Sequence, residues 1–474
     1  MKKNVISLIK DFFYSTGSNL IGAVISALIV LVVPKFIEVE QYGYWQLAVF
    51  YFGYIGFFHL GWADGAYLRY GGARYEKLDK GIFKGQFIAL TFLELFLSIL
   101  ISSFVIISPL DYVKKYIFIF FAAGCLFQLP GTFLRLMLQA TGRIKEYSVN
   151  ILVDKCSYMI LLFLFIFSGA RTYKILIFAD ILSRLLSTLH AIYVCRDIIF
   201  SREKSSIETT LNEAKENISS GSKLLFANLT SMLIIGIVRI GIEHTWDVAT
   251  FGKVSLTLSI SNFVMIFISA ISMIIYPILR RTDSQALPKI YEVLSNIIMA
   301  LIVGMLLVFF PFRFILSMWL PNYADSLVYM AILFPICLYE GKNTLLITTY
   351  LKAYRKEKIL LIVNLISVII SFALTTVFTQ VFASIYFTVL SIVIVLAFRC
   401  ILSEILLSKY VDIKIYKSII CEFICTTIFI ISASLIKKSI IGFLVYLIVY
   451  TGYLLINYKD LKQDILLIKT LIKE

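Results

Sequence analysis

The amino-acid sequence predicts an all-α membrane protein with about fourteen transmembrane helices. Of its 474 residues, 60% are hydrophobic and only 15% are charged, whereas a soluble domain carries about 25% charged and about 45–50% apolar residues. This surplus of apolar surface cannot be buried in one core, so much of it must face lipid. The apolar residues come in runs of about 20, the length of a helix that crosses a bilayer, and not in the alternating segments of about 10 that barrel strands require.

The apolar runs give the order of the expected helices along the chain. Trp45 and Trp62 bracket the second run, and their separation corresponds to about 25 Å of helix rise, close to the thickness of a bilayer core. We expect helices at residues 13–33, 44–61, 85–107, 116–138, 147–168, 175–195, 222–242, 253–276, 291–310, 327–350, 359–378, 382–407, 415–436 and 440–457.

Lysine and arginine are distributed unevenly between the two sides of this helix plan. The segments on the side of the N-terminus carry about three times as many of them as the segments on the other side, and basic residues favour the cytoplasmic side. Both termini are therefore expected in the cytoplasm. This topology explains most of the net charge of +15, so no nucleic-acid partner is expected. The seven cysteines lie in or at the ends of apolar runs without metal-ligand spacing, so neither a metal site nor a disulfide framework is expected.

An internal repeat is indicated on either side of a polar stretch at residues 196–222. The pair NL at 19–20 begins a run that reaches YG at 42–43, and NL at 228–229 begins one that reaches FG at 251–252, an offset of 209 residues at both ends. Matching segments in the same order and at one spacing favour a duplicated unit of six helices.

A second pair of segments supports the same repeat. ATGRIKEY at 140–147 joins the expected fourth and fifth helices, and KAYRKEKI at 352–359 joins the tenth and eleventh. Two halves of six helices each have the same orientation, so a pseudo-two-fold axis along the membrane normal should relate them. The expected domains are a six-helix lobe at 1–195, a cytoplasmic linker at 196–221, a second six-helix lobe at 222–410, and two additional helices with a basic cytoplasmic tail at 411–474.

Several short segments resemble one known family. The most informative is GWADGAYLRYGG at 61–72, which follows the YG at 42–43. The FG at 251–252, YPILRR at 276–281 and the segment 320–358 continue the likeness. Over most of its length the sequence resembles the bacterial O-antigen and capsular oligosaccharide flippases (Wzx type) of the multidrug/oligosaccharidyl-lipid/polysaccharide exporter superfamily.

The resemblance implies two six-helix lobes around a central cationic cavity, and transport by alternating access. The implied substrate is a polyprenyl-diphosphate-linked oligosaccharide, which moves from the cytoplasmic to the outer leaflet of a bacterial plasma membrane for surface polysaccharide biosynthesis. No enzymatic reaction and no cofactor are implied. Besides membrane lipids, a proton or sodium ion and polysaccharide assembly proteins are expected partners.

Other functions stay open at this point. A lipid II flippase would share the fourteen-helix plan and the cationic cavity, and a drug or cation exporter of the same superfamily would have a smaller and more acidic cavity. A membrane polysaccharide polymerase or ligase is a further alternative. That class would be expected to carry a large outer loop with Arg or His residues, and the sequence has no such loop.

Basic residues near or within the apolar runs are the candidates for binding a diphosphate. A charged residue inside the bilayer costs about 2.5–3.5 kcal/mol on insertion scales, so each one needs a partner or a purpose. Arg184 follows Asp180 by one helical turn, which favours an ion pair between them. The expected substrate-binding residues are Arg69, Arg135, Lys155, Arg239 and Lys342, with Arg69 and Arg135 at the inner mouth.

Acidic residues at similar depth are the candidates for ion coupling. Asp64, Asp154 and Glu340 are the expected residues, and Glu94 is a further deep carboxyl group. Each could exchange a proton or a sodium ion, or could simply balance the charge of a neighbouring cation. Glu340 and Lys342 are two residues apart and project from different faces of a helix, so we do not expect them to pair with each other.

Overall fold

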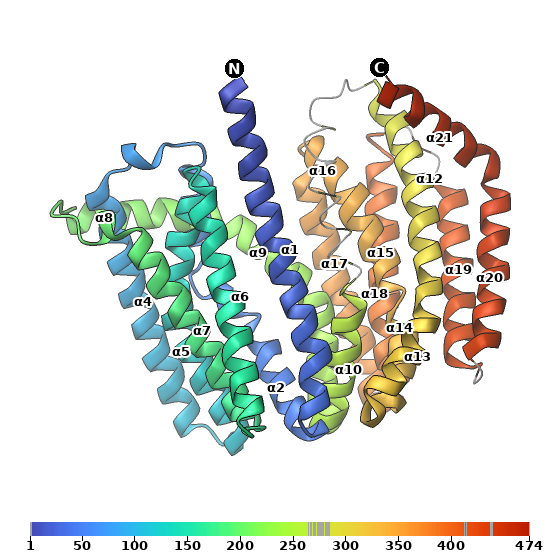
Figure 1. Cartoon of the computed structure of the whole chain (residues 1–474), viewed down its shortest axis with the longest axis horizontal. Helices are drawn as coiled ribbons and strands as arrows, with labels where there is room; N and C mark the ends of the chain where they lie inside the picture. Colours follow the sequence, from blue (N-terminus) through green and yellow to red (C-terminus); the bar gives the residue numbers. More distant parts are fainter. Residues whose placement is uncertain are drawn as a thin grey trace. The chain divides into compact units, whose positions relative to one another are not determined.

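A computed structural model of the chain describes residues 2–263, 265, 268, 272, 279, 285–411, 413, 415–436 and 439–473, and the side chains of nearly all of these from residue 13 to residue 466. The described residues are helical, turn or irregular throughout (Figure 1). The chain divides into two compact units, Met1–Leu229 (unit 1) and Thr230–Glu474 (unit 2), and each is described by itself below.

Unit 1 is built from long helices joined by short turns. Its elements in chain order are α1 (Lys2–Phe36), α2 (Val39–Phe52), η1 (Ile55–Phe57), α3 (Trp62–Arg69), η2 (Tyr75–Lys77), α4 (Lys80–Ile107), α5 (Tyr112–Ala140), α6 (Ile144–Phe167), α7 (Tyr173–Val194), α8 (Arg196–Ile199) and the first part of α9 (Ile207–Thr245).

Unit 2 follows the same principle and adds three helices at its C-terminal end. After α9 it contains α10 (Val248–Ser261), α12 (Leu287–Met305), η3 (Leu306–Val308), α13 (Phe309–Trp319), η4 (Pro321–Ser326), α14 (Leu327–Leu333), α15 (Ile336–Lys342), η5 (Asn343–Thr348), α16 (Thr349–Ala353), α17 (Glu357–Thr376), η6 (Val377–Val381), α18 (Ile385–Leu407), α19 (Tyr416–Ser434), α20 (Ser439–Ile456) and α21 (Tyr458–Lys473).

The helices confirm the fold class predicted from the sequence. Among the described residues, twelve helices are long and apolar enough to cross a membrane. The other two expected helices fall short of that length for different reasons. The helix expected at 253–276 corresponds to α10, beyond which many residues lie outside the described part. Of the motif at 276–281 only Leu279 is described.

The second expected helix, at 44–61, is interrupted in the structure, so a single continuous helix was a wrong prediction. α2 ends at Phe52, and the chain then passes through the short η1 before α3 begins at Trp62. Gly61 precedes α3 with a φ of 85°, a backbone conformation that side-chain-bearing residues rarely adopt. The apolar composition of the segment hid this break, because hydropathy reports the environment of a segment and not its backbone hydrogen bonding.

Helix starts are defined by aspartate caps at three places. Asp79 accepts a hydrogen bond from the backbone N–H of Ile82 at the start of α4 (3.0 Å), and Asp111 accepts one from Lys114 at the start of α5 (2.8 Å). Asp247 does the same for α10. Each carboxylate satisfies a backbone donor that the first helical turn leaves without an intrahelical acceptor.

The segments that match in sequence also adopt matching local structures. α2 and α10 both contain 14 residues, and they start at Val39 and Val248, at the offset found in the sequence. In the two connecting loops, Gly142 and Arg355 have φ values of 79° and 56°. In each loop the next residue donates its backbone N–H to the carbonyl five residues earlier, the pattern of a Schellman motif.

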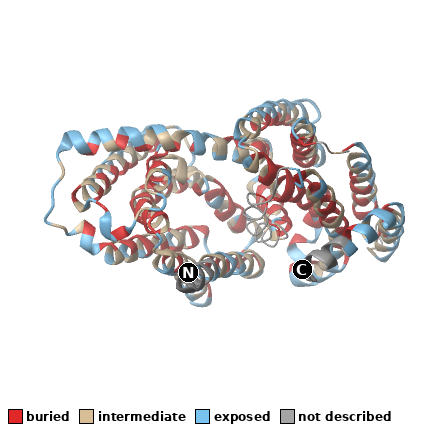
Figure 2. Cartoon of the chain, turned by 90° about the horizontal axis from the view of Figure 1, so that it is seen from above, coloured by how far each residue is buried: buried red, intermediate tan, exposed pale blue. Residues whose placement is uncertain are grey.

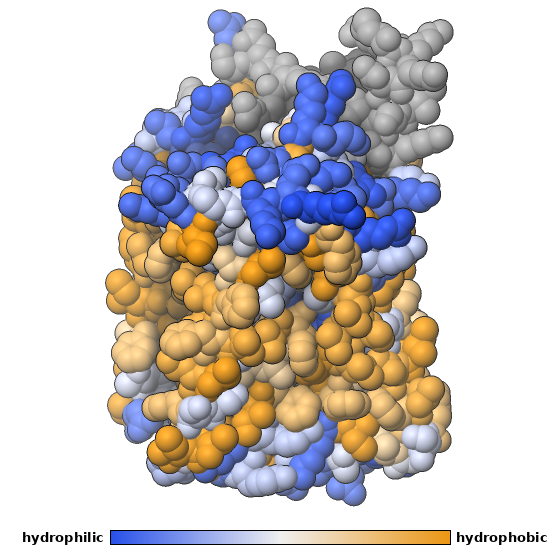
Figure 3. Space-filling view, turned by 90° about the vertical axis from the view of Figure 1, so that its left-hand side faces the viewer, coloured by the Kyte–Doolittle hydropathy of each residue, from blue (hydrophilic) through white to orange (hydrophobic). Residues whose placement is uncertain are grey.

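Within each unit, the buried residues lie mostly on the helix faces turned towards neighbouring helices (Figure 2), and many of the exposed residues are large and apolar. In α4, for example, Leu90 is fully buried, whereas Phe92, Phe96 and Phe104 are 66%, 60% and 71% exposed. In Figure 3, the visible face of the molecule has an apolar belt below a hydrophilic band. An apolar outer surface of this kind is stable in lipid and not in water.

Much of the polar stretch at residues 196–222, expected to be a linker, is helical. The seventh long helix was expected to begin at 222, but α9 begins at Ile207 and its first half packs against α3. Gly61, which precedes α3, and Gly65 within α3 lie against the backbone of Gly221 and Asn217, so closely that a Cβ atom on Gly65 would overlap the carbonyl of Asn217. Small residues at this crossing let the two helix backbones approach each other.

Candidate functional site

Unit 1 contains a cavity of about 560 Å³ among its long helices. Residues of α1, α2, η1, α5, α6 and α7 line the cavity, and most of them have polar or charged side chains. A volume of several hundred Å³ with a few convergent polar groups is typical of a ligand pocket. Three of the residues predicted from the sequence, Arg135, Asp154 and Lys155, line this cavity together.

One basic residue of the cavity is held in an ion pair. Arg184 of α7 contacts the carboxylate of Asp180 through two nitrogens, at 2.9 and 3.1 Å, and also donates to Gln128 of α5. Its guanidinium carbon lies 5.5 Å from the centroid of the Phe52 ring. The predicted pairing of Arg184 with Asp180 is confirmed, and it gives this wall of the cavity a fixed geometry.

The other two basic residues are more weakly held. Arg135 of α5 donates to the hydroxyl of Thr132 at 3.3 Å, and no carboxylate lies within 4.0 Å of it in the part of the chain that the structure describes. Lys155 of α6 lies 3.7 Å from the carboxylate of its neighbour Asp154, and its side chain is 40% exposed. Gly22 of α1 leaves room for the stem of Lys155, whose Cγ atom would contact a Cβ there.

The charged residues that line the cavity give it a net positive charge. Arg135, Lys155 and Arg184 face only Asp154 and Asp180 among the charged residues that line it. An anion that enters can therefore bind Arg135 and Lys155 without displacing the Arg184–Asp180 pair. Charge-assisted hydrogen bonds from Arg and Lys are the usual means of binding phosphate oxygens.

Neutral groups complete the lining. Asn19, Gln128 and Thr132 offer amide and hydroxyl groups, and Tyr147 and Tyr158 add aromatic rings with hydroxyls. The indole N–H of Trp45 donates to the Tyr158 hydroxyl at 3.2 Å, which fixes the ring of that tyrosine. These groups were not predicted as site residues. Their positions follow from the packing of α1, α5 and α6, and no local pattern in the sequence shows it.

The predicted residues of the α3 region lie outside this cavity. Arg69 contacts Glu213 and Asn217 of α9, both at 2.7 Å, and also forms an ion pair with Glu216. Arg69 therefore connects α3 to the first half of α9. Asp64 lies 3.9 Å from the ring of His59, which is almost fully buried.

In unit 2 the predicted residues form a different set of contacts. Arg239 of α9 donates to the hydroxyl of Ser255 at 2.9 Å, and its guanidinium carbon lies 5.1 Å from the centroid of the Phe251 ring. Glu340 pairs with Arg399 at 2.9 Å, and Arg399 also donates to Asn364 of α17. As predicted, Glu340 does not pair with Lys342.

Lys342 is fully buried, and its ammonium group is used inside the protein. It donates to Glu404 at 2.7 Å and to Glu422 at 2.6 Å, and it lies 3.5 Å from the hydroxyl of Ser418. These three acceptors match the three donors of an ammonium group. This geometry provides no donor for a diphosphate, so we do not retain Lys342 among the proposed substrate ligands. Glu404 and Glu422 were not predicted as site residues, although a lone acid in the apolar segment of α19 was a visible signal.

Comparison with solved structures shows which proteins share this fold. A lipid II flippase, MurJ in an inward closed conformation, is similar with a TM-score of 0.66 at 13% sequence identity, covering 96% of this chain and 99% of that chain. A eukaryotic MATE transporter has a TM-score of 0.51 at 15% identity, covering 84% and 95% of the two chains. An inward-facing multidrug resistance MATE transporter of the MOP superfamily has a TM-score of 0.53 at 11% identity, covering 89% and 94%.

The likeness lies in the fold and not in the sequence. No protein-family model matches the chain, and no curated protein matches it in sequence. The chain is thus a multi-pass helical membrane protein with the fold of MOP-superfamily transporters, and the solved proteins that share this fold are transporters and not enzymes.

Proposed function

We propose that this protein is a flippase that moves a polyprenyl-diphosphate-linked oligosaccharide from the cytoplasmic to the outer leaflet of a bacterial plasma membrane, for surface polysaccharide biosynthesis such as O-antigen or capsule. The observation that carries the proposal is the cavity of unit 1, in which Arg135 and Lys155 give a positive balance among apolar helices. A diphosphate needs cations in a region of low dielectric constant, and this cavity supplies them.

The remaining lining of the cavity suits the other polar part of such a substrate. Sugars need hydrogen-bond donors and acceptors, and Asn19, Gln128 and Thr132 offer both. Aromatic rings such as Tyr147 and Tyr158 can pack on the apolar face of a sugar ring. The prenyl chain needs only an apolar surface, which the outer faces of the helices provide.

The other predicted residues take different places in this proposal. Arg239, in unit 2, remains a candidate substrate-binding residue, and Arg69 is proposed to stabilise the contact of α3 with α9. Asp64, Asp154 and Glu340 remain candidates for coupling transport to a proton or sodium ion. Membrane lipids and polysaccharide assembly proteins are the proposed partners in the cell.

A lipid II flippase is the second candidate. The solved structure with the TM-score of 0.66 is described as a lipid II flippase, and lipid II presents the same polyprenyl diphosphate with different sugars. The cavity charges suit both substrates, so the sugars must separate the two functions. A drug or cation exporter is less well supported, because a positive cavity repels cations.

The proposal is tested with the purified protein in proteoliposomes. A lipid-linked oligosaccharide and lipid II are supplied separately, and translocation is followed by access of an impermeant sugar-modifying enzyme. Loss of one charge-assisted hydrogen bond is worth about 1.5–3 kcal/mol, so we expect Arg135→Ala and Lys155→Ala each to slow translocation by about 10- to 100-fold. Arg171→Ala, at an exposed residue outside the cavity, is the matched control and should leave the rate unchanged. Full activity of both cavity variants at normal protein levels would contradict the proposal.

A further inference from the structure

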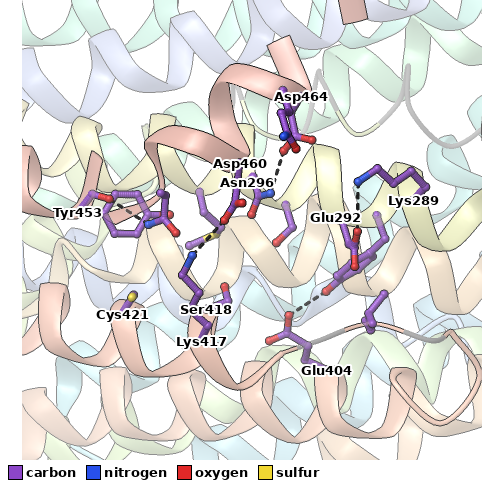
Figure 4. A pocket seen from close by; sticks show the side chains of 16 residues that line it. Lys289, Glu292, Asn296, Glu404, Lys417, Ser418, Cys421, Tyr453, Asp460 and Asp464 are labelled. Carbon is purple, nitrogen blue, oxygen red and sulfur yellow. Dashed lines mark hydrogen bonds and ion pairs between the residues drawn. The ribbon is translucent and has the colours of Figure 1, made fainter. Parts of the chain in front are cut away.

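A second pocket lies in unit 2, where α19, α20 and α21 meet α12 and α18. It has a volume of about 310 Å³ and is lined by Glu404, Ser418 and Cys421 at its inner end (Figure 4). The buried contacts among Lys342, Glu404 and Glu422, called here the triad, adjoin it through Glu404 and Ser418. The pocket lies at the end of unit 2 where α12 and α19 begin and α20 passes into α21.

The triad contains two carboxyl groups and one ammonium group. Lys342, Glu404 and Glu422 are 0%, 1% and 2% exposed. The other titratable groups that face the triad within the described part are Tyr291 from α12, Tyr339 from α15, Cys400 from α18, Cys421 and Cys425 from α19, and Tyr453 from α20. Phenols and thiols are neutral at pH 7. With both carboxyl groups ionised, the triad would hold one uncompensated negative charge in a buried site.

The rim of the pocket does not supply the missing positive charge. Lys289 contacts Glu292 at 3.5 Å, and Lys417 contacts Asp460 at 3.0 Å, so both lysines already have acidic partners. Asp464 accepts a hydrogen bond from Asn296 and adds a further negative charge. Figure 4 shows these contacts, with Glu404 among the side chains that line the pocket. The rim therefore attracts positive charge towards the triad.

The hydrogen bonds identify one carboxyl oxygen that is different from the others. Glu404 accepts from the Tyr291 hydroxyl with Oε1 (2.9 Å) and from Lys342 with Oε2 (2.7 Å). Oε1 of Glu422 accepts from Lys342 at 2.6 Å and also from the Ser418 hydroxyl. Among the described residues, Oε2 of Glu422 accepts no hydrogen bond. A proton on this oxygen would leave the four hydrogen bonds at the other carboxyl oxygens in place, and a protonated carboxyl group carries one O–H donor.

We propose that the triad is a proton-binding site, in which Glu422 holds one proton that exchanges with water in the pocket through Glu404 and Ser418, the neighbouring groups that line the pocket. In the protonated state, Lys342 pairs with Glu404 and the triad is neutral. In the deprotonated state, two carboxylates compete for one ammonium and the triad carries a net negative charge. The net step moves only a proton between water in the pocket and the carboxyl group of Glu422.

A proton fits this site better than a metal ion does. The ammonium group of Lys342 already occupies the position between the two carboxylates, at 2.6 and 2.7 Å from their oxygens. A metal cation at the same carboxylates would lie next to this positive charge and be repelled by it. In the described part of the chain, no group of three or more His, Cys, Asp or Glu side chains is arranged to hold a metal.

The site gives a specific role to the helices that follow the second group of six. Glu422 belongs to α19, Lys342 to α15 and Glu404 to α18, so the charge of the triad affects the contact of α19 with α15 and α18. Loss of the proton weakens this contact, because the two carboxylates then repel each other. Whether proton uptake drives transport rests on the proposed function, but the existence of the site does not.

The experiment titrates the purified full-length protein in micelles without any substrate, from about pH 5 to about pH 9, by infrared difference spectroscopy. The native protein should show the carbonyl band of a buried protonated carboxylic acid, which disappears as the pH rises. Glu422→Gln and Glu404→Gln should each abolish this band, because either variant leaves Lys342 one ionised partner. Glu292→Gln, at a carboxylate whose side chain is 41% exposed, is the control and should keep the band.

Glu94 of α4 is also a fully buried carboxyl group and could give a band of its own, so all of these proteins are compared in a Glu94→Gln background. Two results would overturn the proposal: no such band in that background with the triad intact, or a band that persists in either triad variant. Melting temperatures of both variants show that each is folded, and either folded variant is sufficient for the test. The pH dependence of translocation is then measured for the native protein and Glu422→Gln. A native titration without any translocation would contradict the flippase and leave the proton site intact, so the two proposals fail separately.

Discussion

At the level of residues, the charged side chains within the helices fall into two groups. The side chains of Lys342, Glu404 and Glu422 are nearly or completely buried and contact one another, whereas Arg135 and Lys155 border a cavity. Buried ion pairs are weak evidence for function by themselves, because removing one partner is costly whether or not the pair binds anything. The cavity residues are therefore the better candidates for substrate binding.

Replacement of Lys342 by methionine tests the buried group directly. Lys342→Met leaves a carboxylate without its cationic partner, so we expect the free energy of unfolding to fall by about 3–5 kcal/mol. The triple variant Lys342→Met, Glu404→Gln and Glu422→Gln should recover most of this loss, because it removes all three charges. Melting temperatures in detergent give the comparison. Lys417→Met is the control, because its partner Asp460 is exposed and such pairs contribute about 0–1 kcal/mol.

At the level of elements, sequence patterns predicted contacts that are local and missed contacts that are distant. The pair Arg184 and Asp180 is one helical turn apart and was predicted from that spacing. The partners of Lys342 are 62 and 80 residues away in the sequence, so no local pattern can show them. Hydropathy is also a local property, calculated for each segment alone, so it predicted the long helices.

The crossing of α3 and α9 depends on a glycine that has no room for a side chain. Gly65→Ala would place a Cβ atom on the carbonyl of Asn217, so α3 and α9 would have to move apart. We expect this substitution to cost about 1–3 kcal/mol, the usual range for overpacking. Gly452→Ala in α20 is the control, since nothing lies within 4 Å of its Cβ position. Melting temperatures that are equal for both variants would contradict this view of the crossing.

The N-terminus of α10 gives a prediction with a defined pH dependence. The backbone N–H and the hydroxyl of Thr250 both donate to Asp247 and lower the pKa of its carboxyl group below the ordinary value of 3.8. A lowered pKa means that the folded state favours the ionised form. The stabilisation is therefore complete above the unfolded pKa and is lost as the pH falls through the lower folded pKa.

Two substitutions separate the cap from its charge. Asp247→Ala should cost about 1 kcal/mol at neutral pH, and Asp247→Asn only a few tenths, because asparagine also caps helices. Thermal unfolding of the native protein and both variants at neutral and acidic pH provides the measurement. A native protein that keeps its full advantage over Asp247→Ala well below the folded pKa would contradict the assignment.

At the level of the whole molecule, the sequence predicted more of the fold than of the site. The approximate number of helices and their apolar outer faces follow from the apolar runs in the sequence, because a segment in lipid must be helical and apolar. The interruption between α2 and α3 and the early start of α9 were not predicted, because hydropathy does not report backbone hydrogen bonding or the close contact of Gly65 with the backbone of Asn217. The cavity predicted from the sequence was a central one between two lobes, and the cavity within unit 1 was not predicted. Two of its basic lining residues were candidates, Lys155 for its depth in an apolar run and Arg135 for its place near the inner end of one, whereas the uncharged lining depends on which helices are neighbours.

The remaining whole-molecule property is the orientation in the membrane, which the excess of Lys and Arg on one side predicts. In unit 1, Glu203 and Ser168 are exposed at opposite ends of α7, and in unit 2, Lys358 and Asp325 lie at opposite ends of the span Pro321–Ala353. We expect Glu203→Cys and Lys358→Cys to be protected from an impermeant thiol reagent in intact cells, and Ser168→Cys and Asp325→Cys to react.

The seven native cysteines must first be replaced, because Cys156 and Cys421 are only partly buried. Permeabilised cells provide the control, since all four introduced cysteines should then react. If the labelling pattern is reversed in one unit and as expected in the other, the number of spans between the two labelled regions has been counted wrongly. Reversal in both units would place both termini outside. The basic segments would then lie on the outer side of the membrane, although basic residues favour the cytoplasmic side. A flippase that takes its substrate from the cytoplasm would need a different entry route.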